Sequence, residues 1–120
     1  NVLNMAVVTS FGGYALFLLF RRLLPRSASG VVMAGGLAGG LSVVLGAMTF
    51  SLEWLFGATA PVPFDTVFGA MVGVHALIGV GEGLITAATL SAVLAVRPAL
   101  VLGVRDRLPK PELRPSPQAA

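Results

Sequence analysis

The residues of this sequence whose types could do chemistry lie in the stretch VHALIGVGEGLITAATL, at positions 74–90. His75 and Glu82 place an imidazole and a carboxylate in a run that is otherwise apolar enough for a lipid bilayer. On a continuous helix these two residues project from nearly the same face, with Gly79 between them and Thr86 one turn beyond. A carboxylate is costly in a membrane segment, so it is by default functional or tightly paired.

On an unbroken helix, one metal ion cannot bind both side chains directly. Their axial separation would be about 10 Å, whereas a metal–ligand bond is about 2 Å long. A break at Gly79–Gly81 would be needed to bring His75 and Glu82 together. Two roles stay open for His75, a hydrogen-bonded supporting role and direct ligation of a metal. Two also stay open for Glu82, a paired structural carboxylate and a transport-linked one.

Two asparagines at the start of the sequence form a second candidate set. Asn1 and Asn4 belong to NVLNMAVVTSFGGYALFLLF, a run whose polar residues gather in its first half. An unpaired amide is costly in hydrocarbon, so Asn4 is expected to face protein or water rather than lipid. The alternative is that both asparagines are helix-start residues that satisfy free backbone N–H groups.

The elements that must position these residues are membrane-spanning helices. Of the 120 residues, 56% are hydrophobic and 11% are charged, and the mean hydropathy is +0.91. An average soluble domain is about 25% charged. Apolar blocks occupy about 2–24, 31–56 and 64–96, and each meets the requirement of about 20 residues for one span. The sequence therefore predicts an all-α, polytopic transmembrane helix bundle over residues 1–104, with about three spans.

The third apolar block is too long for a single upright span. As one helix it would reach about 50 Å, against a hydrocarbon core of about 30 Å. It must either tilt strongly or break, and its glycines supply break points. We expect a short outer or re-entrant helix at about 64–77, led in by Pro61 and Pro63, followed by a span at about 78–96.

The second apolar block carries a glycine pattern typical of close helix packing. In AGGLAGG, Gly35/Gly39 and Gly36/Gly40 are two overlapping pairs with the small-xxx-small spacing. Such a surface lets another helix backbone approach closely. The alternative, a glycine-rich phosphate loop, needs a preceding strand and a nearby basic residue, and the sequence shows neither.

Charged and aromatic residues mark the expected membrane interfaces. The basic residues gather in the first loop and after the last block, at Arg21, Arg22, Arg26, Arg97, Arg105, Arg107, Lys110 and Arg114. The intervening loop GATAPVP, at 57–63, has none. The positive-inside rule predicts that the first loop and the C-terminal tail are cytoplasmic, and that residue 1 and the 57–63 loop face outside. At the outer end of the second block, Glu53 and Trp54 are expected to form an interfacial pair, with the carboxylate in water.

The last segment differs in composition from the rest. Residues 105–120, RDRLPKPELRPSPQAA, contain four prolines and no apolar period, which predicts a disordered cytoplasmic tail. The basic residues are not interleaved with aromatic residues on a polar face, so a nucleic-acid partner is not expected. The absence of cysteine excludes disulfides and thiolate metal sites.

Four motifs together resemble a known family. NVLNM opens a span, PVPFDTV follows, and VHALIGVGEGLITA is followed by VLAVRP. In this order they resemble the CbiM/NikM family, the substrate-binding membrane (S) components of energy-coupling-factor cobalt and nickel transporters. The resemblance covers nearly all of residues 1–104. Since the chain begins without an initiator methionine or a signal peptide, we expect it to be the C-terminal half of such a subunit.

The resemblance implies a multi-pass subunit of the cell membrane that captures Co²⁺ or Ni²⁺ from outside. Its expected partners are a transmembrane coupling (T) subunit, cytoplasmic ATPase subunits and, in some systems, a small accessory membrane subunit. The chain itself would not be an enzyme, and no GxxxxGK[ST] loop occurs in it.

In this family the metal is held chiefly by an N-terminal Met-His segment and by a histidine of an earlier helix. Neither is present in these residues. The resemblance therefore implies no metal ligand and no bound cofactor here, with Co²⁺ or Ni²⁺ as the transported ion of the full-length protein. The residues expected to shape or support the substrate site are Asn1, Asn4, His75, Glu82 and Thr86.

Two other functions stay open. The first is a proton-coupled secondary transporter that uses Glu82, but such transporters usually show internal repeats and the three blocks show no convincing self-similarity. The second is a purely structural membrane protein. A structural anchor gives no reason for an imidazole and a carboxylate on one intramembrane face, so this function is the least favoured.

Overall fold

The structure, a computed structural model, describes residues 2–104. Asn1 and the predicted disordered tail at 105–120 lie outside the described residues. The elements are the π-helical segment η1 (Val2–Val8), the α-helices α1 (Thr9–Leu23), α2 (Ala28–Gly57) and α3 (Phe64–Val96), and the short 3₁₀ turns η2 (Pro98–Leu100) and η3 (Leu102–Val104). No strand occurs among these residues, and the predicted all-α fold is confirmed.

Three helical runs are long and apolar enough to cross a membrane. They are Val2–Leu23, which joins η1 to α1, then Ala28–Gly57 and Phe64–Val96. The three-span prediction is therefore confirmed. The ends follow from local sequence, because Pro25 and Pro98 disfavour helix just before them. Ser27 caps α2 by accepting a hydrogen bond from the Gly30 backbone N–H at 3.1 Å.

The predicted break in the third block is wrong, because α3 is one continuous helix of 33 residues. No described glycine has a positive φ, so none of the glycines in α3 acts as a hinge. The physical reason is twofold. An unbroken helix satisfies its own backbone polar groups in hydrocarbon, and α2 supports α3 along its length. The expected re-entrant helix at 64–77 is simply the first part of α3.

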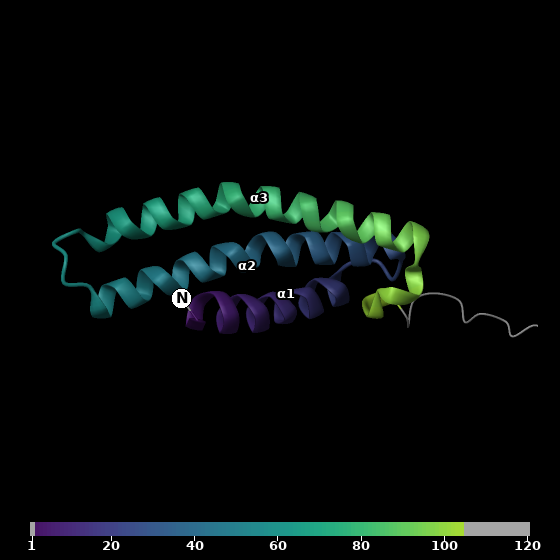
Figure 1. Ribbon diagram of the computed structural model, residues 1–120, viewed down its shortest axis with the longest axis horizontal. Helices are drawn as coiled ribbons and strands as arrows, with labels where there is room; N and C mark the ends of the chain where they lie inside the picture. The colour runs from purple at the N-terminus through teal and green to yellow at the C-terminus, as the bar shows by residue number, and fades with distance from the viewer. Residues whose placement is uncertain (1, 105–120) are drawn as a thin grey trace, which may run out of the picture.

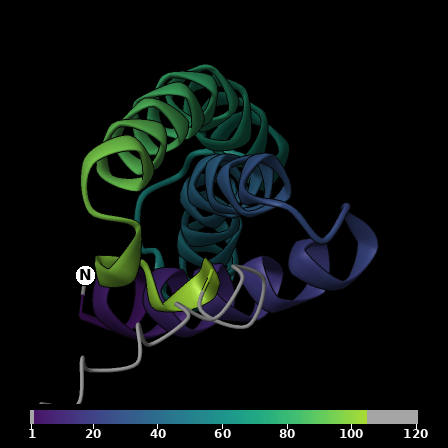
Figure 2. The ribbon, with the colours of Figure 1, turned by 90° about the vertical axis from the view of Figure 1, so that its right-hand side faces the viewer.

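The α2 helix lies between the other two (Figure 1). It packs against α3 on one side and against η1 and α1 on the other, while no described Cα atom of α1 lies within 8 Å of one of α3. The end-on view in Figure 2 shows α2 beside α3, with α1 below them. This arrangement leaves an opening between α1 and α3 whose floor is α2.

The contact between α2 and α3 is a close approach of two backbones. A Cβ atom on Gly40 would lie 2.5 Å from the Gly79 carbonyl oxygen, and one on Gly79 would lie equally close to the Gly40 carbonyl oxygen. The pair Gly36 and Gly83 repeats this relation at 2.9 and 2.8 Å. A real Cβ does not fit at such distances, so these four glycines set the spacing of the two helices. We call this contact the glycine seam.

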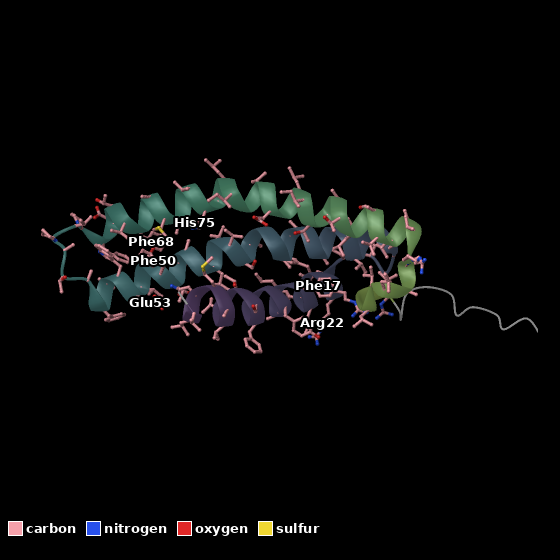
Figure 3. All side chains as sticks on the ribbon, in the orientation of Figure 1. Phe17, Arg22, Phe50, Glu53, Phe68 and His75 are labelled. Carbon is pink, nitrogen blue, oxygen red and sulfur yellow. The ribbon has the colours of Figure 1, made fainter. Side chains whose placement is uncertain are left out.

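The two ends of the bundle differ in charge. Four arginines lie near the end where α1 meets α2 and where α3 terminates; they are Arg21, Arg22, Arg26 and Arg97. We call this the arginine end, and the opposite end, at residues 58–63, the loop end. Glu53 and Asp65 lie toward the loop end, on α2 and at the start of α3. Figure 3 shows the separation for Arg22 and Glu53.

Candidate functional site

A pocket of about 410 Å³ lies in the opening between α1 and α3. Its polar lining side chains are Asn4, Thr9, Ser42, His75 and Glu82, and its sulfur-bearing ones are Met5 and Met71. The structure thus brings three of the predicted site residues, from η1 and α3, to one pocket.

Thr86 is not among the lining residues. It lies at the glycine seam, where a Cβ atom on Gly39 would be 3.0 Å from the Thr86 hydroxyl oxygen. The other predicted packing glycine, Gly35, faces Leu90 of the same helix α3. All four glycines of the AGGLAGG motif therefore lie against α3, and Thr86 belongs to that contact rather than to the pocket. Asn1, the remaining predicted site residue, lies outside the described residues.

Asn4 is buried, with 5% of its surface exposed, and so it faces protein as expected. Its amide nitrogen, Nδ2, donates a hydrogen bond of 2.9 Å to Oε2 of Glu53, which lies 49 positions away on α2. The side chain is therefore not a cap for the first helical turn. Gly46 of α2 leaves room beside this contact for Thr9, since a Cβ atom on Gly46 would lie 2.9 Å from the Thr9 methyl carbon.

The carbonyl oxygen of the Asn4 side chain has no hydrogen-bond partner among the described residues, although it is fully buried. A buried acceptor without a donor costs about 1–3 kcal/mol. Asn4 lines the pocket while Glu53 does not. The donor end of the amide thus faces Glu53, and the buried carbonyl oxygen has no partner from these residues.

The imidazole of His75 has a defined hydrogen-bonding direction. Its Nδ1 atom lies 2.7 Å from the Met71 carbonyl oxygen, one turn earlier on α3. A carbonyl oxygen only accepts, so in the neutral imidazole the hydrogen is on Nδ1 and the lone pair is on Nε2. Nε2 has no hydrogen-bond partner within residues 2–104. An imidazole held in this way has the form that binds a metal ion.

The two hydroxyl groups of the pocket are oriented in the same sense. Ser42 donates to the Gly39 carbonyl oxygen at 2.7 Å, and Thr9 donates to the Met5 carbonyl oxygen. A hydroxyl has a single hydrogen, so both groups can only accept from a ligand. Glu82, an exposed carboxylate on α3, has no hydrogen-bond or ion-pair partner in the described part of the chain.

The polar lining is therefore a set of electron-pair donors. The hydrogens of the hydroxyl groups and of the neutral imidazole are used on their own helical runs, and one of the two Nδ2 hydrogens of Asn4 is donated to Glu53. Such a lining suits a cation or a hydrogen-bond donor better than an anion. Residues 2–104 contain no group of three or more acidic, histidine or cysteine side chains that could hold a resident metal ion.

Since α3 is unbroken, His75 and Glu82 stay about 10 Å apart along its axis and cannot bind one ion together. Figure 3 shows His75 on α3 in the same half of the molecule as Phe50 and Glu53 of α2. A cation in the pocket would meet one imidazole nitrogen, an amide oxygen and hydroxyl oxygens, with the charge of Glu82 nearby.

Sequence reasoning missed Glu53 as a partner of the site. Glu53 was expected to lie in water beside Trp54; it is exposed, and its carboxylate also accepts the hydrogen bond from Asn4. One signal was present. A buried asparagine needs a partner, and Glu53 is the only carboxylate in the second apolar block. The roles of Thr9, Ser42 and Met71 had no comparable signal, since they depend on which helix faces meet.

Comparison with known proteins gives one family match. The sequence profile of CbiM, described as the cobalt uptake substrate-specific transmembrane region, matches residues 1–100. A protein of Haloquadratum walsbyi that carries the name of a metal transport protein is 34% identical over 101 residues. A protein of Archaeoglobus fulgidus that carries the name of a fused nickel transport protein, NikMN, is 32% identical over 101 residues. The match covers 84% of this chain in both cases, but 44% and 32% of those two relatives. No solved structure matches the chain.

Proposed function

The chain belongs to the CbiM family of cobalt uptake substrate-specific transmembrane regions, and from this membership we propose that it forms part of a membrane subunit that captures Co²⁺ or Ni²⁺ for uptake. The named relatives support metal transport as the activity of the whole protein. The chain spans less than half the length of each of them, so the activity belongs to a longer protein than these residues.

The observation that carries the proposal is the pocket whose hydroxyl, imidazole and carboxylate groups are left to accept rather than to donate. Co²⁺ and Ni²⁺ bind imidazole nitrogen well and also accept oxygen ligands. The lone pair of His75 Nε2 and the unpartnered carbonyl oxygen of Asn4 are the groups best suited to such an ion. Glu82 adds a negative charge at the same pocket. In this proposal Asn4, His75 and Glu82 support the capture site, and His75 either touches the ion or holds a group that does.

We further propose that uptake is driven by ATP through partner subunits. A transmembrane coupling subunit and cytoplasmic ATPases would supply the energy, because this sequence has no nucleotide-binding loop of its own. The arginine end would face the cytoplasm and those ATPases, and the loop end would face outside in the cell membrane. The pocket, on the loop-end side of the arginines, would then be reached by the ion from outside.

Metal titration of the purified full-length protein tests the capture role. If His75 supports the site, His75→Ala should weaken Ni²⁺ binding about 10–100-fold while the protein stays folded; if it is a ligand, binding should be lost. Leu77→Ala is the matched control, since Leu77 is 77% exposed, lies on the same helix and does not line the pocket. Equal Ni²⁺ affinity for wild type and His75→Ala would remove His75 from the site.

Glu82 favours one other function, a proton-coupled secondary transporter. It lines the pocket and has no partner among residues 2–104, as a proton-carrying carboxylate would. Vesicles that contain the full-length protein with its partner subunits separate the two mechanisms. Nickel uptake that needs ATP and is indifferent to an imposed pH gradient supports the ATP-driven transporter. Uptake that follows the gradient without ATP, and is lost in Glu82→Gln, supports the proton-coupled one.

A further inference from the structure

Glu53 contacts a residue of the site, but the proposed function gives it no role. It is the partner of Asn4 Nδ2 at 2.9 Å, yet it does not line the pocket. Its own helix position is exposed, whereas Asn4 is only 5% exposed. The hydrogen bond therefore joins an accessible carboxylate to a buried amide at the wall of the pocket.

We propose that Glu53 is a positioning residue for cation capture, because its carboxylate fixes which end of the Asn4 amide is offered to the pocket. An ionised carboxylate can only accept hydrogen bonds. Nδ2 must therefore point toward Glu53, and the carbonyl oxygen Oδ1 must point away from it. The reversed amide would place two acceptor oxygens against each other and would turn an NH₂ group toward the pocket. That orientation is disfavoured at Glu53 and would repel a cation.

The state of Oδ1 is the second observation that supports this role. It is a fully buried acceptor that no described residue satisfies, in a side chain that lines the pocket. Buried acceptors in proteins are normally paired. The partner of this oxygen therefore comes from outside residues 2–104. In this proposal the partner is the captured cation, and the hydrogen bond to Glu53 holds the acceptor in place before the cation arrives.

Glu53 also contributes a negative charge toward the loop end, whereas the described arginines lie at the opposite end of the bundle. Glu53 makes no ion pair within the described residues. A control must therefore separate the loss of charge from the loss of positioning. Asp65 provides it, since this carboxylate also lies toward the loop end, in the first turn of α3, and neither lines the pocket nor bonds to Asn4.

The proposal rests on the proposed function and is tested on the full-length protein by calorimetric titration with Ni²⁺. In E53Q the new amide can donate as well as accept, so the orientation of Asn4 is no longer forced. We expect Ni²⁺ affinity to fall about 10-fold, within the range for residues that orient a metal-binding group. D65N, which loses the same charge, should bind as wild type does.

The double variant N4D/E53Q provides the rescue. In N4D alone, two carboxylates lie side by side, and we expect both lower affinity and lower thermal stability. In N4D/E53Q the amide introduced at position 53 can donate to one oxygen of the carboxylate introduced at position 4 and leave the other oxygen as an acceptor. Ni²⁺ affinity should therefore return to within about threefold of wild type. This variant also carries the test if E53Q does not fold, since it keeps a hydrogen bond between the two positions.

The Ni²⁺ affinities of these variants decide whether Glu53 has the positioning role. Wild-type affinity in E53Q, an equal loss in D65N, or no recovery in N4D/E53Q would overturn the positioning role. A fall in the melting temperature of E53Q with unchanged Ni²⁺ affinity would show that the hydrogen bond is only structural. If His75→Ala weakens binding while E53Q does not, the proposed function stands and the positioning role fails; if the wild type binds neither Ni²⁺ nor Co²⁺, the proposed function itself fails.

Discussion

Glu82 is an exposed carboxylate that lines the pocket and has no partner in the described structure. The sequence left two roles open for it, a paired structural carboxylate and a transport-linked one. Breaking a buried charge pair costs about 3–5 kcal/mol, but nothing within residues 2–104 forms such a pair with Glu82. Its expected contribution is therefore electrostatic, through the charge it adds to the pocket.

We predict that Glu82→Gln leaves the full-length protein folded and weakens Ni²⁺ binding by about 4- to 250-fold. The estimate follows from one negative charge at about 10 Å from a divalent ion, worth about 0.8–3.3 kcal/mol between the limits of water and a protein surface. Thermal unfolding and Ni²⁺ titration of the same preparation provide both readouts. A collapse of folded yield would instead mean that Glu82 has a buried partner in the full-length protein.

For single residues, the sequence predicted the members of the candidate site better than it predicted the hydrogen bonds between them. Asn4, His75 and Glu82 were identified because polar groups are rare in apolar blocks, and the structure places them at one pocket. The hydrogen bond from Asn4 to Glu53 was not predicted, since its ends lie 49 positions apart and meet only when η1 packs on α2. Asn1 remains a prediction from the sequence.

At the scale of elements, the glycine seam makes the sharpest prediction. Gly40→Ala or Gly79→Ala places a Cβ 2.5 Å from a carbonyl oxygen of the facing helix. Backbone cannot yield as a side chain can, so each substitution should destabilise the protein by about 1–3 kcal/mol through overpacking. Unfolding of each variant in detergent, followed by circular dichroism, measures this loss.

Gly73→Ala and Gly81→Ala are the matched controls on α3. A Cβ at either position meets nothing within 4 Å among the described residues. Because α3 is continuous, alanine should be tolerated there or should stabilise the helix by up to about 1 kcal/mol, the difference in helix propensity. Equal destabilisation at all four positions would show that the glycine seam is no more tightly packed than the rest of α3. It would also reopen the possibility of a break in α3.

Helix ends and helix breaks differ in how well sequence predicts them. The first two spans, and the bounds of the third apolar block, were predicted to within about three residues, since long apolar blocks and prolines act locally. The break in α3 was predicted from the length of the block and from the freedom of glycine. The structure shows that Gly79 and Gly83 instead allow close packing against α2. Whether a glycine breaks a helix or allows such a contact depends here on the partner helix α2.

For the molecule as a whole, the separation of charge predicts its orientation in the membrane. The described arginines all lie near one end, and the loop between α2 and α3 has no basic residue. Single cysteines at Ser27 and at Ala58 should therefore react with a membrane-impermeant reagent from opposite sides, with Ser27 on the cytoplasmic side. Labelling of both from the same side would contradict the three-span topology.

The central position of α2 could not be predicted from sequence. Both connections are short, and either neighbour could have packed against either face of α2. What the arrangement provides is an opening between α1 and α3, lined by acceptor groups from η1, α1, α2 and α3. The proposed function requires that the cation is captured in this opening.

The most direct measurement is anomalous diffraction from crystals of the full-length protein loaded with Ni²⁺, recorded at the nickel absorption edge. If the pocket captures the cation, an anomalous peak will appear there, in contact with His75 Nε2 or with a group that His75 holds, and beside the carbonyl oxygen of Asn4. A nickel peak at the glycine seam, at the arginine end or elsewhere away from the pocket would contradict this expectation.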